Sequence, residues 1–266
     1  MNRNESLYSL AHAGVVDLAI VGGGATGLGV ALDAALRGYS VALMESHDFA
    51  GGTSSRSTKL LHGGVRYLAQ GNVSLVREAL HERQSILAIA PHLAAPLSFV
   101  MPAYAWWKLP FYTVGLKLYD LLAGRAGLGA TEWLSRRETA QALPGVQVRG
   151  LHGGVKYWDA QFDDARLALA IAHTARAAGA NVLNHVKVAN LQALEGQSDG
   201  AKWALDWQNQ KGVEQGVLRA KCVVNAAGVW VDDVLAKVKG HVPTRRMVTP
   251  SQGVHLEVDR RFLAGK

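Results

Sequence analysis

The sequence predicts an α/β protein whose larger domain binds a dinucleotide, and three features predict it. A short β-branched run, 17–21, leads into the glycine-rich segment 22–38, and a second apolar run, 40–45, follows. Both runs are almost continuously apolar, which is typical of parallel strands buried on both faces. The order of strand, glycine turn, helix and strand therefore indicates a Rossmann-like β-α-β unit.

The composition narrows the classes of partner. The chain has 266 residues, of which 49% are hydrophobic, and its net charge of +7 favours anionic partners. Basic residues are spread along the chain and are not interleaved with aromatic ones, so we expect no nucleic acid. The one cysteine, Cys222, lies in an expected buried strand and leaves no internal disulfide, which fits a reducing compartment.

The location expected from the sequence is cytoplasmic, with possible contact to the inner face of the cytoplasmic membrane as a peripheral protein. No secretory signal is evident, and the longest uncharged runs, 18–32 and 93–107, fall short of the roughly 20 apolar residues of a spanning helix. The aromatic segment 103–112, "AYAWWKLPFY", suits either a lipid-facing patch or packing within the second domain.

The remaining elements predict a discontinuous FAD-binding domain, 15–95 and 145–240, and a partial α+β substrate or cap domain, 96–144 and 241–266. Helical spacing over 72–90 places Arg77, Glu78, Glu82 and Arg83 on the polar side of an amphipathic helix. Ser135 and Glu138 form a capping-box pattern. Further helices are expected at 110–124 and 162–179, and further strands at 97–102, 151–160, 180–188, 202–208, 221–228 and 253–258.

The glycine turn carries the nucleotide prediction. Gly22, Gly24 and Gly27 form G-x-G-x-x-G, which permits a tight turn, close approach of a pyrophosphate and close helix packing. Glu45 closes the second strand and can accept hydrogen bonds from a ribose, which disfavours a 2′-phosphate and so favours FAD or NAD over NADP. The hydroxyl-rich segment 51–68 and the small residues Ala227 and Gly228 favour FAD.

Five segments carry a specific family resemblance: 17–68, "APHLAAPLSF", "YWDAQFDDARL", "VVNAAGVWVDD" and "PSQGVHLEV". In this order they resemble FAD-dependent glycerol-3-phosphate dehydrogenases and oxidases. The resemblance implies a flavoprotein oxidoreductase of glycerol metabolism that oxidises sn-glycerol 3-phosphate to dihydroxyacetone phosphate and passes electrons to quinone or oxygen. Family members are longer, so we expect this chain to be the N-terminal part of such an enzyme.

The resemblance also implies the residues of the site. His62 is a candidate general base, or a residue that only packs against the cofactor. Arg66, with Tyr67 beside it, is expected to bind the substrate phosphate, although an arbitrary arginine is more often a surface ion pair. His255 is a second candidate base, or a satisfied histidine on a strand. No metal site is expected, and the further cofactor-binding residues expected are Thr53, Ser54, Ser55, Ser57, Thr58, Lys59, Leu61, Gly63 and Gly64.

Three alternatives remain open from the sequence. Asp163, Asp164 and Arg166 match the family but suit the capping of a helix. A related flavin oxidase acting on an amino or hydroxy acid would use arginine for a carboxylate instead of a phosphate. A non-catalytic fragment that binds the dinucleotide is the third possibility.

Overall fold

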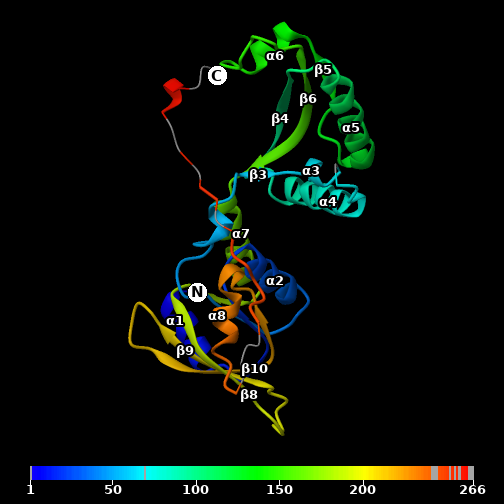
Figure 1. Cartoon of the computed structure of the whole chain (residues 1–266). Helices are drawn as coiled ribbons and strands as arrows, with labels where there is room; N and C mark the ends of the chain where they lie inside the picture. The colour runs from blue at the N-terminus through cyan, green and yellow to red at the C-terminus, as the bar shows by residue number, and fades with distance from the viewer. Residues whose placement is uncertain are drawn as a thin grey trace. The chain divides into compact units, whose positions relative to one another are not determined.

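The computed structural model describes residues 2–68, 70–240, 245–251, 253, 254, 256 and 259–262, and of Arg66, Arg125 and Arg260 the backbone alone. The chain forms two compact units (Figure 1). Unit 1 comprises 1–57 and 164–252, and unit 2 comprises 58–163 and 253–266.

Unit 1 is built on a six-stranded sheet with the order β7-β2-β1-β10-β9-β8. The first four strands in this order run parallel, and β9 and β8 continue the sheet antiparallel. This mixed sheet confirms the expected α/β fold. The strands are β1 (Val15–Val21), β2 (Val41–Met44), β7 (Asn181–Leu183), β8 (Val186–Ala193), β9 (Trp203–Asn209) and β10 (Gln215–Asn225).

Two helices cover β1, β2 and β7 on one face of this sheet. They are α2 (Ala25–Leu36) and α7 (Asp164–Ala177), and their small residues let them pack closely around Ile20 and Leu43. Helix α1 (Arg3–Ala11), which the sequence analysis did not predict, contributes Leu7 and Leu10 to the second core of the unit. The short helix α8 (Val231–Leu235) follows β10.

Two expectations about the strands of unit 1 are wrong. The segment 180–188 is not one strand, because His185 has a φ of 52° and turns the chain between β7 and β8. Cys222 is exposed rather than buried. The core that α2 and α7 form lies mainly on β1, β2 and β7, so it does not cover this part of β10.

Unit 2 is built around the antiparallel pair of β4 (Ala94–Ala103) and β6 (Gly153–Phe162). The short strands β3 (Leu60–Leu61) and β5 (Glu132–Leu134) also pair with β6. Figure 1 shows helices α4 and α5 beside these strands. Leu80 and Tyr119 pack between the two helices, and Leu116 packs on Val155 of β6. The helices are α3 (Val65–Leu68), α4 (Val73–Ile89), α5 (Lys108–Ala123) and α6 (Arg136–Ala142).

The expected capping box of unit 2 is confirmed, whereas the compact units divide at other residues than the expected domains. The capping box of α6 is present, with the Glu138 amide 3.3 Å from Ser135 Oγ and the Ser135 amide 2.7 Å from Glu138 Oε2. Strand β6, expected in the first domain, pairs with β4 along its whole length. The expected strand 253–258 falls largely outside the described residues. Within the described residues, no helix has both the length and the apolarity to cross a bilayer.

Candidate functional site

The glycine turn between β1 and α2 is shaped by two close backbone approaches. Gly22 has a φ of 112°, and a Cβ there would lie 2.5 Å from the Ala226 carbonyl oxygen. A Cβ on Gly27 would overlap the carbonyl oxygen of Gly22. These two positions therefore require glycine, the first for the turn and the second for the packing of the helix against the strand.

Polar groups converge on this turn from two other segments. Ser54 lies in the 3₁₀ turn Thr53–Ser55, and its Oγ accepts a hydrogen bond of 2.9 Å from the Ala25 amide at the start of α2. The Glu45 carboxylate accepts the Gly23 amide at 2.7 Å and the His47 amide at 2.7 Å. Both side chains thus fix the loops around the N-terminal end of α2, where amides and positive helix potential favour an anion.

A cavity of about 680 Å³ opens at this end of the sheet in unit 1. It is bounded by the glycine turn, the end of β2, the 3₁₀ turn and the segment after β10. Gly27, Ser55 and Ser57 do not line it. The predicted cofactor residues that do line it are Gly22, Gly24, Glu45, Thr53, Ser54, Ala227 and Gly228.

The cavity has a second wall that the sequence analysis missed. It comprises residues from the start of β8, the segment around Gln210, and α8 with its flanks. The Val186 amide donates to the Glu45 carbonyl oxygen at 2.7 Å, so β8 begins beside the end of β2. Lys237 Nζ donates to the Val188 carbonyl oxygen at 3.0 Å. Burial, together with the nearby charge of Lys187, lowers the pKa of Lys237.

Ser57 and Asp164 have a structural role. The Ser57 hydroxyl donates to Asp164 Oδ2 at 2.7 Å, and its amide donates to the same oxygen at 3.2 Å. Asp164 is buried in the first turn of α7, where a carboxylate is favoured by the helix dipole. The pair therefore ties the hydroxyl-rich loop to the helix.

The other predicted site residues lie in unit 2, on a turn between β3 and α3. His62 is exposed, Gly64 has a φ of 78°, and a Cβ on Gly63 would overlap the Tyr119 hydroxyl. Arg66 and Tyr67 follow in the single turn of α3, and Tyr67 is exposed. The turn therefore gathers His62, Arg66 and Tyr67 within one short segment. His255 lies outside the described residues.

A buried ion pair anchors this turn, and the sequence analysis missed it. Arg83, expected on the polar side of its helix, is buried, and its Nη1 lies 2.8 Å from Asp159 Oδ1 of β6. The Asp159 carboxylate also accepts the Gly63 amide, at 3.0 Å and 3.2 Å to its two oxygens. Burial raises the pKa of Asp159, and the hydrogen bond from Arg83 opposes the rise. Burial also raises the pKa of Tyr119.

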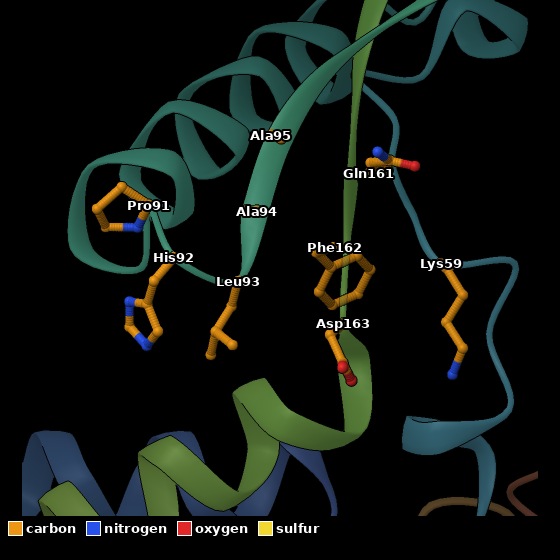
Figure 2. Close-up of a pocket in the computed structure, with 9 residues that line it drawn as sticks. All are labelled: Lys59, Pro91, His92, Leu93, Ala94, Ala95, Gln161, Phe162 and Asp163. Carbon is orange, nitrogen blue, oxygen red and sulfur yellow. The ribbon is translucent and has the colours of Figure 1, made fainter.

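A second, open cavity of about 480 Å³ lies in unit 2, where β4 begins and β6 ends (Figure 2). Lys59, predicted to bind the cofactor, lines this cavity together with His92 and Asp163. The Lys59 backbone has a φ of 59°, and its carbonyl oxygen accepts the Phe162 amide at 3.0 Å. Leu61 lies on β3, paired with Ala160 of β6.

Comparison with known proteins identifies the family. The model of the family described as FAD dependent oxidoreductase matches residues 17–265. The mitochondrial glycerol-3-phosphate dehydrogenase of Mesocricetus auratus is 44% identical over 265 residues, covering 96% of this chain and 36% of the relative. The glycerol-3-phosphate dehydrogenase of Mycobacterium leprae (strain TN) is 42% identical over 248 residues, covering 92% and 41%. The chain thus spans about a third of the length of such curated relatives.

Solved structures agree with this assignment. The glycerol-3-phosphate dehydrogenase from Bacillus halodurans complexed with FAD is 33% identical, with a TM-score of 0.65 over 88% of this chain and 38% of that chain. The L-alpha-glycerophosphate oxidase from Mycoplasma pneumoniae with FAD bound has a TM-score of 0.62 over 85% of this chain and 57% of its own. At 20% identity it supports the fold alone. The chain belongs to the family of FAD dependent oxidoreductases.

Proposed function

We propose that the protein containing this chain oxidises sn-glycerol 3-phosphate to dihydroxyacetone phosphate with FAD as cofactor. The observation that carries the proposal is a difference in sequence identity between two groups of similar proteins. Relatives named glycerol-3-phosphate dehydrogenase are 40–44% identical, whereas a glycine oxidase and an L-proline dehydrogenase of similar fold are 22% and 16% identical. Because the chain spans about a third of those relatives, the activity of the whole protein is inferred from their likeness.

The residues of unit 1 fit an FAD dinucleotide. The backbone at Gly22 and Gly27 leaves no room for a Cβ, and the α2 N-terminus supplies amides for a pyrophosphate. We propose Glu45 as an acceptor for a ribose hydroxyl, and the hydrogen bond from the Gly23 amide, which holds its carboxylate beside these amides, supports this role. When bound, FAD supplies the acceptor for the hydride that leaves the substrate carbon.

The substrate roles are assigned to the turn in unit 2. We propose His62 as the base that accepts the proton of the substrate hydroxyl at an imidazole nitrogen, with His255 as the second candidate. Arg66 is proposed to bind the phosphate through paired N–H donors, with the Tyr67 hydroxyl as a further donor. Gly63 and Gly64 let the backbone of this turn lie close to Tyr119 and Tyr67, because a Cβ at either position would collide with those side chains.

A substrate panel tests the proposal against the related amino-acid and hydroxy-acid oxidases. The purified chain, loaded with FAD, is mixed without oxygen with glycerol 3-phosphate, glycine, L-proline or L-lactate, and flavin absorbance is followed. We expect bleaching by glycerol 3-phosphate alone. Bleaching by an amino or hydroxy acid instead would assign the chain to the alternative class, and a folded chain that binds FAD but is bleached by none would favour the non-catalytic fragment.

The electron acceptor is proposed to be a quinone, with oxygen as the alternative. The curated relatives are named dehydrogenases, whereas the glycerophosphate oxidase shares only 20% identity. Re-oxidation of the bleached chain by a soluble quinone analogue, compared with air-saturated buffer, separates the two. Rapid re-oxidation in air with production of hydrogen peroxide would favour oxygen.

We further propose a cytoplasmic protein that contacts the inner face of the cytoplasmic membrane through α5. Its outward side carries apolar residues at helical spacing, with Leu121 76% exposed, and Trp106 just before the helix is 74% exposed. Lys117 is exposed on the same helix. An apolar stripe with tryptophan and lysine suits the interface of an anionic lipid surface. The exposed large hydrophobic residues on α5 are Phe111, Val114, Leu118 and Leu121.

A further inference from the structure

The ion pair of Arg83 and Asp159 lies in the interior of unit 2. Each residue is only 2% exposed, although one comes from α4 and the other from β6. Arg83 Nη2 also donates to the Ala126 carbonyl oxygen at 2.8 Å, and Nη1 lies 3.3 Å from the Tyr119 hydroxyl. Burying two charges costs desolvation energy that their attraction often does not recover. Stability alone is therefore a weak reason for this pair.

The carboxylate of this pair has a second partner. Both Asp159 oxygens lie within 3.2 Å of the Gly63 amide, which is the first amide after His62. On its other side, Gly63 is enclosed by Tyr119 and by Leu80, whose Cδ2 lies 2.5 Å from the position of a Cβ. The backbone of the turn is thus held at one point by a hydrogen bond to a charged acceptor and by close packing.

We propose that the Arg83–Asp159 pair is a positioning device that fixes the turn carrying His62 and Arg66. Arg83 orients the carboxylate through its hydrogen bonds, and the carboxylate holds the Gly63 amide. His62 then projects from a fixed backbone while its own side chain stays exposed. The inference rests on the proposed function, in which His62 and Arg66 act on the substrate, and it assigns positioning roles to two residues that do not act on it.

A double replacement separates positioning from stability. Arg83→Met with Asp159→Leu replaces the pair by apolar side chains, which often preserves or raises the stability of a fold, but it removes the acceptor of the Gly63 amide. Arg83→Gln with Asp159→Asn removes both charges and keeps a carbonyl oxygen in the place of the acceptor. Lys156→Met with Glu132→Leu is the matched control, since this 3.3 Å pair joins β6 to β5 and is more exposed.

Two measurements are made on each chain: hydrogen exchange of the Gly63 amide by NMR, and the rate of flavin reduction at saturating glycerol 3-phosphate. In the Met/Leu chain we expect faster exchange at Gly63 and reduction slowed on the order of 10²-fold, because small displacements of reacting groups carry costs of this size. The Gln/Asn chain and the control are expected to stay close to the unchanged chain in both measurements.

The inference is overturned if the folded Met/Leu chain is reduced as fast as the unchanged chain. If the Met/Leu chain does not fold, hydrogen exchange in the unchanged chain still tests the anchoring of the turn. Fast exchange of the Gly63 amide in that chain would contradict the anchoring, and slow exchange would support it. Failure of the proposed function has a different signature, namely an unchanged chain that glycerol 3-phosphate does not reduce. The exchange measurement then tests the anchoring of the turn by itself.

Discussion

Arg66 is the residue on which recognition of the substrate phosphate depends in the proposed reaction. Arg66→Met keeps an extended side chain and removes the guanidinium. Losing hydrogen bonds from a charged group should raise the apparent KM for glycerol 3-phosphate about tenfold to a hundredfold, with FAD still bound. Initial rates over a range of substrate concentrations measure this. Arg77→Met, on the exposed face of α4, is the matched control, and an equal KM in both variants would contradict the phosphate role.

His62 is tested by the rate of the proton-coupled step. His62→Asn keeps a polar side chain of similar size but cannot accept the substrate proton. We expect flavin reduction slowed by about 10² to 10⁴-fold, which is the usual contribution of a general base, with unchanged FAD content. Stopped-flow absorbance measures the rate. His81→Asn on α4 is the control, and a His62→Asn chain that reacts as fast as the control would leave His62 without a catalytic role.

At the residue scale, the residues of the dinucleotide motif could be predicted from the sequence, whereas the buried charged residues could not. Gly22, Gly24 and Glu45 could be predicted because their spacing is local, and all three line the cavity of unit 1. The burial of Arg83 could not be predicted, because its neighbours in the sequence indicate an exposed side of the helix. Its partner, Asp159, lies 76 positions away in the sequence. Burial of a charge depends on such a distant partner, which a local pattern does not contain.

At the scale of the element, helix α2 offers a sharp test of the glycine turn. Gly27→Ala forces a Cβ into the Gly22 carbonyl oxygen, whereas the space around Gly29, in the same helix, is open. We expect Gly27→Ala to lower the free energy of unfolding by about 1 to 3 kcal/mol and to weaken FAD binding. Gly29→Ala should raise the free energy of unfolding by about 0.5 to 1 kcal/mol, because alanine is more favourable than glycine inside a helix.

Denaturant unfolding and FAD titration of the two alanine variants measure these effects. Because both substitutions add the same methyl group to the same helix, helix propensity cancels between them. Equal stability and equal FAD affinity in the two variants would show that the close approach at Gly27 does not shape the site.

Helix α5 carries the proposed contact with a membrane. Phe111→Glu with Leu121→Glu places two charges on its exposed apolar stripe, so binding to vesicles of anionic phospholipid should fall strongly. Vesicle flotation measures the bound fraction. Val213→Glu with Val217→Glu is the control, since both valines are exposed in unit 1. Undiminished binding of the α5 variant, or loss of binding in the control as well, would contradict a role for this stripe.

Elements with local end signals were predictable. The capping box of α6 and Gly124 at the end of α5 lie where the sequence pattern places them. The split between β7 and β8 was not predictable, because it depends on a left-handed backbone at His185, a residue without the usual turn preference of glycine. The capping box of α1, Asn2 with Glu5, is a local signal that could have revealed this helix.

At the scale of the whole molecule, the α/β class followed from the sequence but the division into units did not. The β-α-β pattern predicts parallel pairing of β1 and β2, and this is confirmed. The pairing of β4 with β6, and of Val15 with Arg219, joins segments far apart in the chain. Such pairings depend on tertiary packing, so a local sequence pattern does not predict that strand 153–162 pairs with β4.

The central proposal is that the protein containing this chain oxidises glycerol 3-phosphate with FAD as cofactor. The most direct measurement adds a known amount of glycerol 3-phosphate without oxygen to the FAD-loaded protein that contains this chain, and quantifies flavin absorbance together with dihydroxyacetone phosphate. We expect complete bleaching and one dihydroxyacetone phosphate formed for each FAD reduced. A folded, yellow protein whose absorbance stays unchanged, with no dihydroxyacetone phosphate formed, would contradict the proposal.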